Sequence, residues 1–409
     1  SDSDPIYRGF DGPLTVTTTK WPTSLERAFY ESARNMGFTH NPDYNGAFQD
    51  GFGAYQSSIH RGWRVSTASA FLHPARKKFS VDIRCNALAT SIQFDELRAN
   101  GVVYLQGDKL KSVKATREII IAAGALNSPK LLQLSGIGPR ALLRRHKIDV
   151  RVELQGVGEN LRDHFTPRLQ IQAKPGLVTM NQEVSWFKLI KQLIRWSFGF
   201  TSILSISPGR AYIFGKSNPE LKNPDYVILF APASYKAGRG GVLDDFPGFT
   251  LGVWQMRPKS SGYVRISSKD ATVHPNFNLR YLSHSEDSPV LLAAIRAARK
   301  LLATEPLASL VQSEILPGID LNSDDELLEF ARSYGATSYH LVGSCKMGSR
   351  QDISSVVDPR LRVHDIKGLR VADASIMPTI PSANTAAATM MIAEKAADLI
   401  LEDSRQVKT

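Results

Sequence analysis

The stretch that decides the fold of this chain reads EIIIAAGALNSPKLLQLSG, from residue 118 to residue 136. Its unbroken isoleucines predict a strand that is buried on both faces. The strand ends at Gly124, where a backbone without a side chain can approach a ligand closely. Ser128 and Pro129 then have the residue types of an N-cap and a first helical residue. This order is typical of the ligand edge of an α/β sheet, although plain packing of strand on helix would need the same pattern.

A β-meander is predicted immediately before this stretch. Short apolar runs with polar connections between them cover residues 81–84, 88–94, 101–104 and 112–115. Short strands joined by polar turns pair antiparallel with their neighbours. With the buried strand and its helix, they predict an α/β fold that is α+β when taken over the whole chain.

A second region, from residue 168 to about residue 270, alternates in a way that predicts further strands. The clearest runs cover residues 226–230, 249–254 and 263–267. One amphipathic helix, predicted from Glu183 to Trp196, interrupts them with aromatic and aliphatic side chains on one side and basic ones on the other. We expect this helix to cover a sheet of its own domain; a membrane surface, to which basic amphipathic helices also bind, is the alternative.

Other helices have clear start and stop signals. The helix predicted from Ser24 to Met36 ends before Gly37, the residue type that favours a left-handed cap. Another opens at Ser288 and runs to about Ala303, and Ser323 begins a third through a capping box.

Size and composition limit the classes of protein that fit. A chain of 409 residues predicts two domains, or one domain with a large insertion. No apolar run is long enough to cross a membrane, and the first residues do not resemble a signal peptide. Because the basic residues behind the net charge of +11 are scattered, we expect a solvated surface rather than a nucleic-acid or membrane partner. Cys85 and Cys345 form no disulfide framework, which favours a reducing, cytoplasmic setting.

The candidates for chemistry lie in the C-terminal stretch from residue 339 to residue 400. His340 stands in YHLVGSCKMG, among Gly and Ser rather than on an apolar face, although an isolated histidine is more often structural than catalytic. Asn384 precedes a helix predicted from Thr385 to Leu401 and has the residue type of an N-cap. A helix start also offers unpaired N–H groups and partial positive charge to an anion. No cysteine or histidine spacing fits a metal site, and no Gly-x-Ser-x-Gly elbow indicates a serine hydrolase.

Three blocks of the sequence resemble the glucose-methanol-choline (GMC) oxidoreductases, FAD enzymes that oxidise alcohols. They are GALNSPKLLQLSGIGP at residues 124–139, GVGENLRDH at residues 156–164, and the stretch 339–400. The resemblance extends over essentially the whole chain. It implies an FAD-binding, Rossmann-like domain with a β-meander, and a substrate domain built on an antiparallel sheet. The first would comprise residues 60–165 and 336–409 and the second residues 166–335, with residues 1–59 as a connecting or cap segment.

The resemblance also implies roles for particular residues. His340 falls where the family keeps its catalytic histidine, and Asn384 where members carry a second His or Asn. The positions implied to contact FAD are Ala89 at the adenine, Asp373 and Ala374 along the cofactor chain, and Thr385 and Ala386 at the flavin pyrimidine edge. Gly124 and Asn384 are further cofactor-binding candidates.

The implied reaction is oxidation of a primary alcohol to its aldehyde by hydride transfer to flavin N5. His340 would be the general base and Asn384 would orient the substrate oxygen. Oxygen or a quinone would accept the electrons. A non-redox lyase of the same fold, similar to hydroxynitrile lyases, and a cofactor-free binding module are the alternatives. A quaternary ammonium substrate would need an aromatic or acidic cage, and the sequence does not place its tryptophans.

The sequence departs from the family pattern in two respects. It contains no Gly-x-Gly-x-x-Gly fingerprint after a strand, the element that cradles the FAD pyrophosphate. We expect that segment to precede the present sequence or to lie on a separate chain; otherwise this chain cannot hold FAD unaided. Leu341 and Ser344 also stand where many relatives have Pro and Thr, which leaves the subfamily open.

Overall fold

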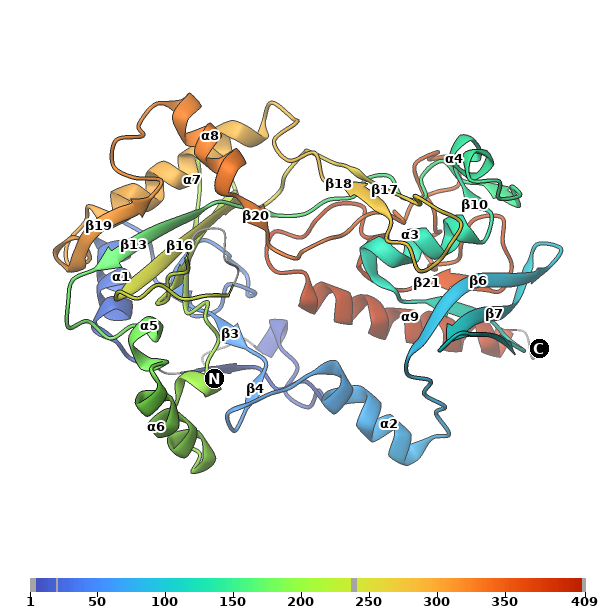
Figure 1. Ribbon diagram of the computed structural model, residues 1–409, viewed down its shortest axis with the longest axis horizontal. Helices are drawn as coiled ribbons and strands as arrows, with labels where there is room; N and C mark the ends of the chain where they lie inside the picture. Colours follow the sequence, from blue (N-terminus) through green and yellow to red (C-terminus); the bar gives the residue numbers. More distant parts are fainter. Residues whose placement is uncertain (1–4, 20, 237–240, 407–409) are drawn as a thin grey trace. The chain divides into compact units, whose positions relative to one another are not determined.

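The computed structural model describes residues 5–19, 21–236 and 241–406. It divides into two compact units (Figure 1). The sheet unit comprises Ser1–Asp82, Phe165–Met256 and Ser288–Ala336, and the meander unit comprises Ile83–His164, Arg257–Asp287 and Thr337–Thr409. Among the described residues, no helix has the length and apolar character that crossing a bilayer requires.

The sheet unit is built on one six-stranded sheet with the order β19-β13-β16-β15-β14-β2. Its strands are β2 (Gly51–Ala54), β13 (Arg168–Ala173), β14 (Ala211–Gly215), β15 (Tyr226–Ala231), β16 (Gly248–Gln255) and β19 (Val311–Leu316). Every pair of neighbours is antiparallel. The predicted antiparallel sheet is therefore confirmed, and β15 and β16 coincide closely with the apolar runs that predicted them.

Three helices of this unit follow the start and stop signals in the sequence. They are α1 (Ser24–Asn35), α7 (Asp287–Leu302) and α8 (Asp324–Tyr334). Phe29 of α1 packs on Phe230 of β15 with ring centroids 5.0 Å apart. The capping box of Ser323 and Glu326 is present at the start of α8. Smaller elements are β1 (Thr17–Thr18), β3 (Gln56–Ser57), β4 (Ile59–His60), β5 (Trp63–Arg64), α2 (His73–Lys78) and α5 (Met180–Glu183).

The predicted amphipathic helix is present as α6 (Trp186–Ser197), but the prediction that it covers a sheet is wrong. Gln192 is its one buried residue, and Trp186, Phe187, Ile190, Leu193 and Ile194 are exposed. The helix therefore does not use its apolar face to cover a sheet.

The meander unit contains the predicted meander as three antiparallel strands, β6 (Ala87–Asp95), β7 (Arg98–Gln106) and β8 (Lys109–Lys114). The run at residues 81–84 has no regular structure, so that part of the prediction is wrong. The isoleucine run forms β9 (Ile119–Ile121), which pairs in parallel with β21 (Leu369–Val371). Ile119 and Ile121 are buried, but Ile120 is 42% exposed. The prediction that this strand is buried on both faces is therefore wrong.

The helix after β9 begins earlier than the sequence predicts. It is α3 (Gly124–Leu134), so Ser128 and Pro129 lie inside it rather than at its start. Pro129 has no N–H to donate to the carbonyl of Ala125, four residues before it. The buried hydroxyl of Ser344 donates to that carbonyl instead, at 2.5 Å. A contact from a distant segment thus satisfies the acceptor that the proline leaves unpaired.

The remaining elements complete the meander unit. They are β10 (Ile137–Gly138), β11 (Val152–Glu153), α4 (Arg140–Arg145), β17 (Tyr263–Arg265), β18 (Asn276–Asn278) and α9 (Ala386–Gln406). Residues 257–287, which we expected in the substrate domain, cluster in this unit. The side chain of Gln133 on α3 explains the association, because it donates to Val264 O at 3.0 Å and accepts from Ile266 N at 2.9 Å. Which unit holds cofactor and which holds substrate stays a prediction.

Candidate active site

The backbone around His340 is fixed by one buried carboxylate, that of Asp163. The amide of His340 donates to Asp163 Oδ1 at 2.8 Å. The hydroxyls of Thr337 and Tyr281 donate to Asp163 Oδ2 at 2.5 and 2.6 Å. Burial, followed by the contact with Asp163, raises the pKa of Tyr281, so the phenol stays a neutral donor. Asp163 therefore anchors the loop that presents the histidine.

Tyr339 beside it has a backbone angle φ of +61°, in the left-handed region that bulky residues rarely adopt. Its amide donates to the hydroxyl of Thr337 at 2.8 Å, which ties this conformation to the Asp163 network. Such conformations persist where the surroundings enforce them, and they cluster at functional sites.

The imidazole of His340 is held at both ring nitrogens. Its Nε2 lies 3.0 Å from Asn384 Nδ2, and its Nδ1 lies 3.0 Å from Nδ1 of His164. His340 is 9% exposed, and His164 is fully buried. The two predicted catalytic residues are therefore brought together, with a second histidine behind them.

These contacts select one tautomer of His340. The amide nitrogen of Asn384 is a donor, so Nε2 of a neutral imidazole accepts and its Nδ1 carries the proton. Nδ1–H then donates to the lone pair on His164 Nδ1. Burial lowers the pKa of His340, against the opposing effect of the negative charge of Asp163. The neutral base form with its lone pair on Nε2 is favoured.

The start of α9 adjoins His340, because Asn384, which comes shortly before the helix, contacts the His340 ring. The helix begins at Ala386, so Thr385 directly precedes it; Asn384, which we expected as the N-cap, uses its amide on His340. Ala386 is exposed, and its methyl group leaves the first amides of a 21-residue helix open to a ligand. These N–H groups and the helix dipole favour negative charge nearby.

Asp373 and Gly124 meet at the ends of the parallel strands β21 and β9. Asp373 Oδ2 accepts from Gly124 N at 2.9 Å and from the Ser128 hydroxyl at 2.5 Å, and Oδ1 accepts from Ser375 N at 2.7 Å. Gly124 has φ of +80°, and the space that a Cβ would occupy there is open. Its backbone is therefore accessible to a ligand, as the sequence suggests.

Ala374 and Ala89 are half-buried. Ala374 accepts from Gly343 N at 3.2 Å, so it adjoins the loop after His340. Ala89 lies on β6 opposite Tyr104, and no contact described for the chain joins it to the His340 or Asp373 groups. The structure thus forms two clusters from the predicted residues and leaves Ala89 on the meander.

The sequence did not single out Asp163, His164, Tyr281 or Arg257. Asp163 and His164 end the block GVGENLRDH. A carboxylate followed by a histidine after a glycine turn could have marked them as site residues. Tyr281 and Arg257 carried no such signal. Arg257 donates to the Ser382 hydroxyl at 2.8 Å and so fixes the turn before Asn384.

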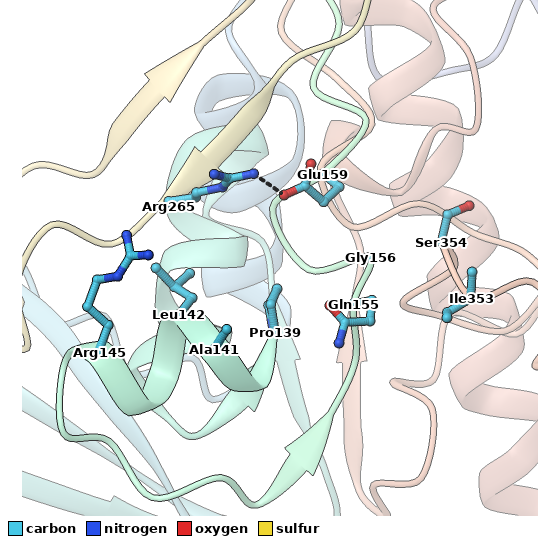
Figure 2. Close-up of a pocket in the computed structure, with 10 residues that line it drawn as sticks. All are labelled: Pro139, Ala141, Leu142, Arg145, Gln155, Gly156, Glu159, Arg265, Ile353 and Ser354. Atoms are coloured by element: carbon cyan, nitrogen blue, oxygen red, sulfur yellow. Dashed lines mark hydrogen bonds and ion pairs between the residues drawn. The ribbon is translucent and has the colours of Figure 1, made fainter.

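The described residues form no metal cluster at this site, and the hollow beside α4 is lined by other residues. Within the described ranges, no three His, Cys, Asp or Glu side chains converge as metal ligands would. A hollow of about 460 Å³ lies beside α4 and includes Pro139, Leu142, Gly156 and Ile353 (Figure 2). On its wall Arg265 pairs with Glu159 at 3.0 Å. It contains none of the predicted site residues.

The chain belongs to the GMC oxidoreductase family, whose N- and C-terminal family models match residues 1–166 and 258–393. It is 39% identical over 396 residues to the oxygen-dependent choline dehydrogenase of Pectobacterium atrosepticum, covering 96% of this chain and 70% of that protein. It is 38% identical over 398 residues to the protein of the same name in Escherichia coli K12, covering 96% of this chain and 71% of that one. A solved formate oxidase superposes with a TM-score of 0.88 at 25% identity, covering 97% of this chain and 74% of the other.

These relationships confirm the predicted family, the mixed FAD-binding fold and the enzyme class. FAD is the cofactor of this family, whose solved members include formate oxidase with FAD. The coarse prediction of FAD-dependent oxidoreduction of an alcohol-type donor is therefore confirmed.

Proposed function

We propose that this chain oxidises a primary alcohol to the aldehyde, with His340 as the general base and Asn384 as the residue that orients the substrate oxygen. The observation that carries this proposal is the pair of contacts on the His340 ring. Asn384 on Nε2 and His164 on Nδ1 support a neutral imidazole whose lone pair is directed at the start of α9.

The residues present fit FAD. Gly124 offers an accessible backbone, the start of α9 offers amide donors behind small side chains, and Asp373 holds the turn at Gly124 in place. We assign Gly124, Asp373 and Ala374 to the cofactor chain, Thr385 and Ala386 to the pyrimidine edge, and Ala89 to the adenine. When bound, FAD supplies the hydride acceptor, and all other steps are assigned to groups of this chain.

In the proposed reaction the alcohol oxygen forms hydrogen bonds with both His340 Nε2 and Asn384 Nδ2, in place of the direct contact between these two atoms. His340 Nε2 accepts the hydroxyl proton as the C–H bond gives up its hydride and the C=O bond forms. General bases of this kind contribute about 10² to 10⁴ in rate. The imidazolium that results donates from Nδ1 to His164, which keeps the ring in place while it is charged.

The relatives' name makes choline the first primary alcohol to test and oxygen the first electron acceptor, with a quinone as the other. The test is anaerobic mixing of the full-length, FAD-loaded protein with choline and with simple aliphatic and aromatic primary alcohols, followed at the flavin absorbance. Bleaching by at least one alcohol is the expected result. Flavin that stays oxidised with all of them would favour the lyase alternative and contradict the proposal.

A further inference from the structure

The helix α6 turns its apolar side chains away from the sheet unit. The apolar ridge consists of Trp186, Phe187, Ile190, Leu193, Ile194 and Phe198. Their exposed fractions run from 43% at Ile190 to 84% at Phe187. Contiguous exposed apolar surface of this kind marks an interaction site more often than single, scattered apolar residues do.

The helix is fixed in this orientation by its other face. Gln192, 7% exposed, donates to Glu183 at 2.7 Å and accepts from Ile203 N at 3.2 Å. Trp196 donates from its indole to Gly62 O at 3.0 Å and packs on Trp63 with ring centroids 4.3 Å apart. Because polar and aromatic anchors hold the inner face, the ridge cannot turn inward without breaking them.

A basic stripe runs along one side of the ridge. Lys188, Lys191 and Arg195 follow one another at spacings of three and four residues, which places them on one side of a helix. Lys188 pairs with Glu183 at 3.4 Å, and Arg195 donates to Thr201 O at 3.0 Å. The sequence has no Asp or Glu from residue 184 to residue 219. The exposed surface of α6 is therefore apolar on the ridge and positive along one side of it.

We propose that α6 is an interfacial helix that binds the surface of an anionic lipid bilayer. A helix with Trp, Phe and Leu on one face and Lys and Arg beside them lies in the headgroup region with its apolar face buried about 5–10 Å deep. Tryptophan side chains favour that boundary. The cations attract anionic headgroups, each contributing about fivefold in affinity near the surface.

The basic stripe also favours a bilayer over a second copy of the chain as the partner of α6. An antiparallel two-fold contact through α6 would bring Lys188, Lys191 and Arg195 of one copy near the same residues of the other, and like charges at an interface oppose association. Anionic lipid meets both the apolar ridge and the stripe.

The experiment is cosedimentation of the full-length, FAD-loaded protein with vesicles of phosphatidylcholine, either alone or mixed with phosphatidylglycerol. The wild type should pellet with the mixed vesicles and far less with phosphatidylcholine alone. Phe187→Ser should weaken binding to the mixed vesicles about tenfold. The matched control is Ile319→Ser, since Ile319 is 70% exposed in the same unit but lies outside α6; it should bind as the wild type does.

The charge contribution is tested separately. Lys191→Gln should weaken binding about fivefold on mixed vesicles and leave the weak binding to phosphatidylcholine unchanged, whereas Lys222→Gln, elsewhere in the sheet unit, should change neither. Three results would overturn the proposal: no pelleting of the wild type with anionic vesicles, equal pelleting of wild type and Phe187→Ser, or a wild-type dimer that Phe187→Ser dissociates without any lipid binding.

Discussion

Two hydrogen bonds on the His340 ring favour the neutral form of the imidazole that can accept a proton. Its ring nitrogens contact groups from different parts of the chain, Asn384 before α9 and His164 at the end of the GVGENLRDH block. Asn384 supplies a donor, so the opposite nitrogen must donate to His164, and the tautomer follows from this pairing. Asp163 then fixes the backbone rather than the ring.

The pH dependence of the reaction tests this arrangement. Burial lowers the pKa of His340 below its ordinary value of 6.5, and Asp163 limits the shift. The base is active when neutral, so activity should be lost only as the pH falls through this lowered pKa. We expect the acidic limb of a kcat/KM profile with a primary alcohol to have its midpoint below pH 6.5 and a plateau through neutral pH. A midpoint above that value would contradict the assignment.

His164 is predicted to position His340. His164→Leu removes the acceptor for Nδ1–H and should lower kcat by about tenfold to a hundredfold, less than loss of the base itself. His164→Asn retains an oxygen near the same place and should recover part of this loss. The control is His364→Leu, because His364 is also buried in the meander unit but pairs with Ser355 at 3.1 Å. Steady-state rates at saturating alcohol measure the effect, and equal losses in His164→Leu and His364→Leu would leave only a structural role.

At the scale of elements, local patterns predicted the strands better than the helix boundaries. β15, β16 and the capping box of α8 depend on neighbours in sequence, and they were predicted correctly. The start of α3 depends on Asp373 and Ser344, which lie 245 and 219 residues from their partners on that helix. For α6, the pattern gave the apolar face but not its direction, which Gln192 and Trp196 decide.

The contact between Ser344 and α3 gives a stability prediction. Ser344→Ala leaves the buried carbonyl of Ala125 unpaired and should lower the free energy of unfolding by about 1–3 kcal/mol. In a Pro129→Ala background, the new amide at residue 129 can donate to that carbonyl, so the same serine substitution should cost less. Urea unfolding of the four proteins in this cycle measures the difference. Additive effects would show that the serine does not replace the missing helical bond.

At the scale of the whole molecule, the candidate site is assembled from segments far apart in the sequence. Residues 163 and 164, Tyr281, the loop at 337–340 and Asn384 all belong to the meander unit. Family resemblance supplied His340 and Asn384 in advance, since they match motifs. Asp163, His164 and Tyr281 act through tertiary contacts that spacing does not encode, and they became apparent only from the hydrogen bonds.

FAD binding should raise the stability of the whole molecule. A ligand that binds only the folded state contributes about 2.7 kcal/mol at a concentration a hundred times its Kd. We therefore expect the Tm of the full-length protein to rise when the FAD-stripped form is reloaded. FMN, which lacks the adenosine part, should raise it less, because the contact proposed at Ala89 is lost. Equal stabilisation by the two flavins would contradict the adenine assignment.

The central claim is that His340 removes the proton of an alcohol. The most direct test is the rate of flavin reduction when full-length His340→Ala is mixed anaerobically with an alcohol that reduces the wild type, with His364→Leu as the control. We predict that His340→Ala is slower by about 10² to 10⁴ while it retains bound FAD, and that the control keeps a rate close to that of the wild type. An unchanged rate of flavin reduction in FAD-loaded His340→Ala would contradict the claim.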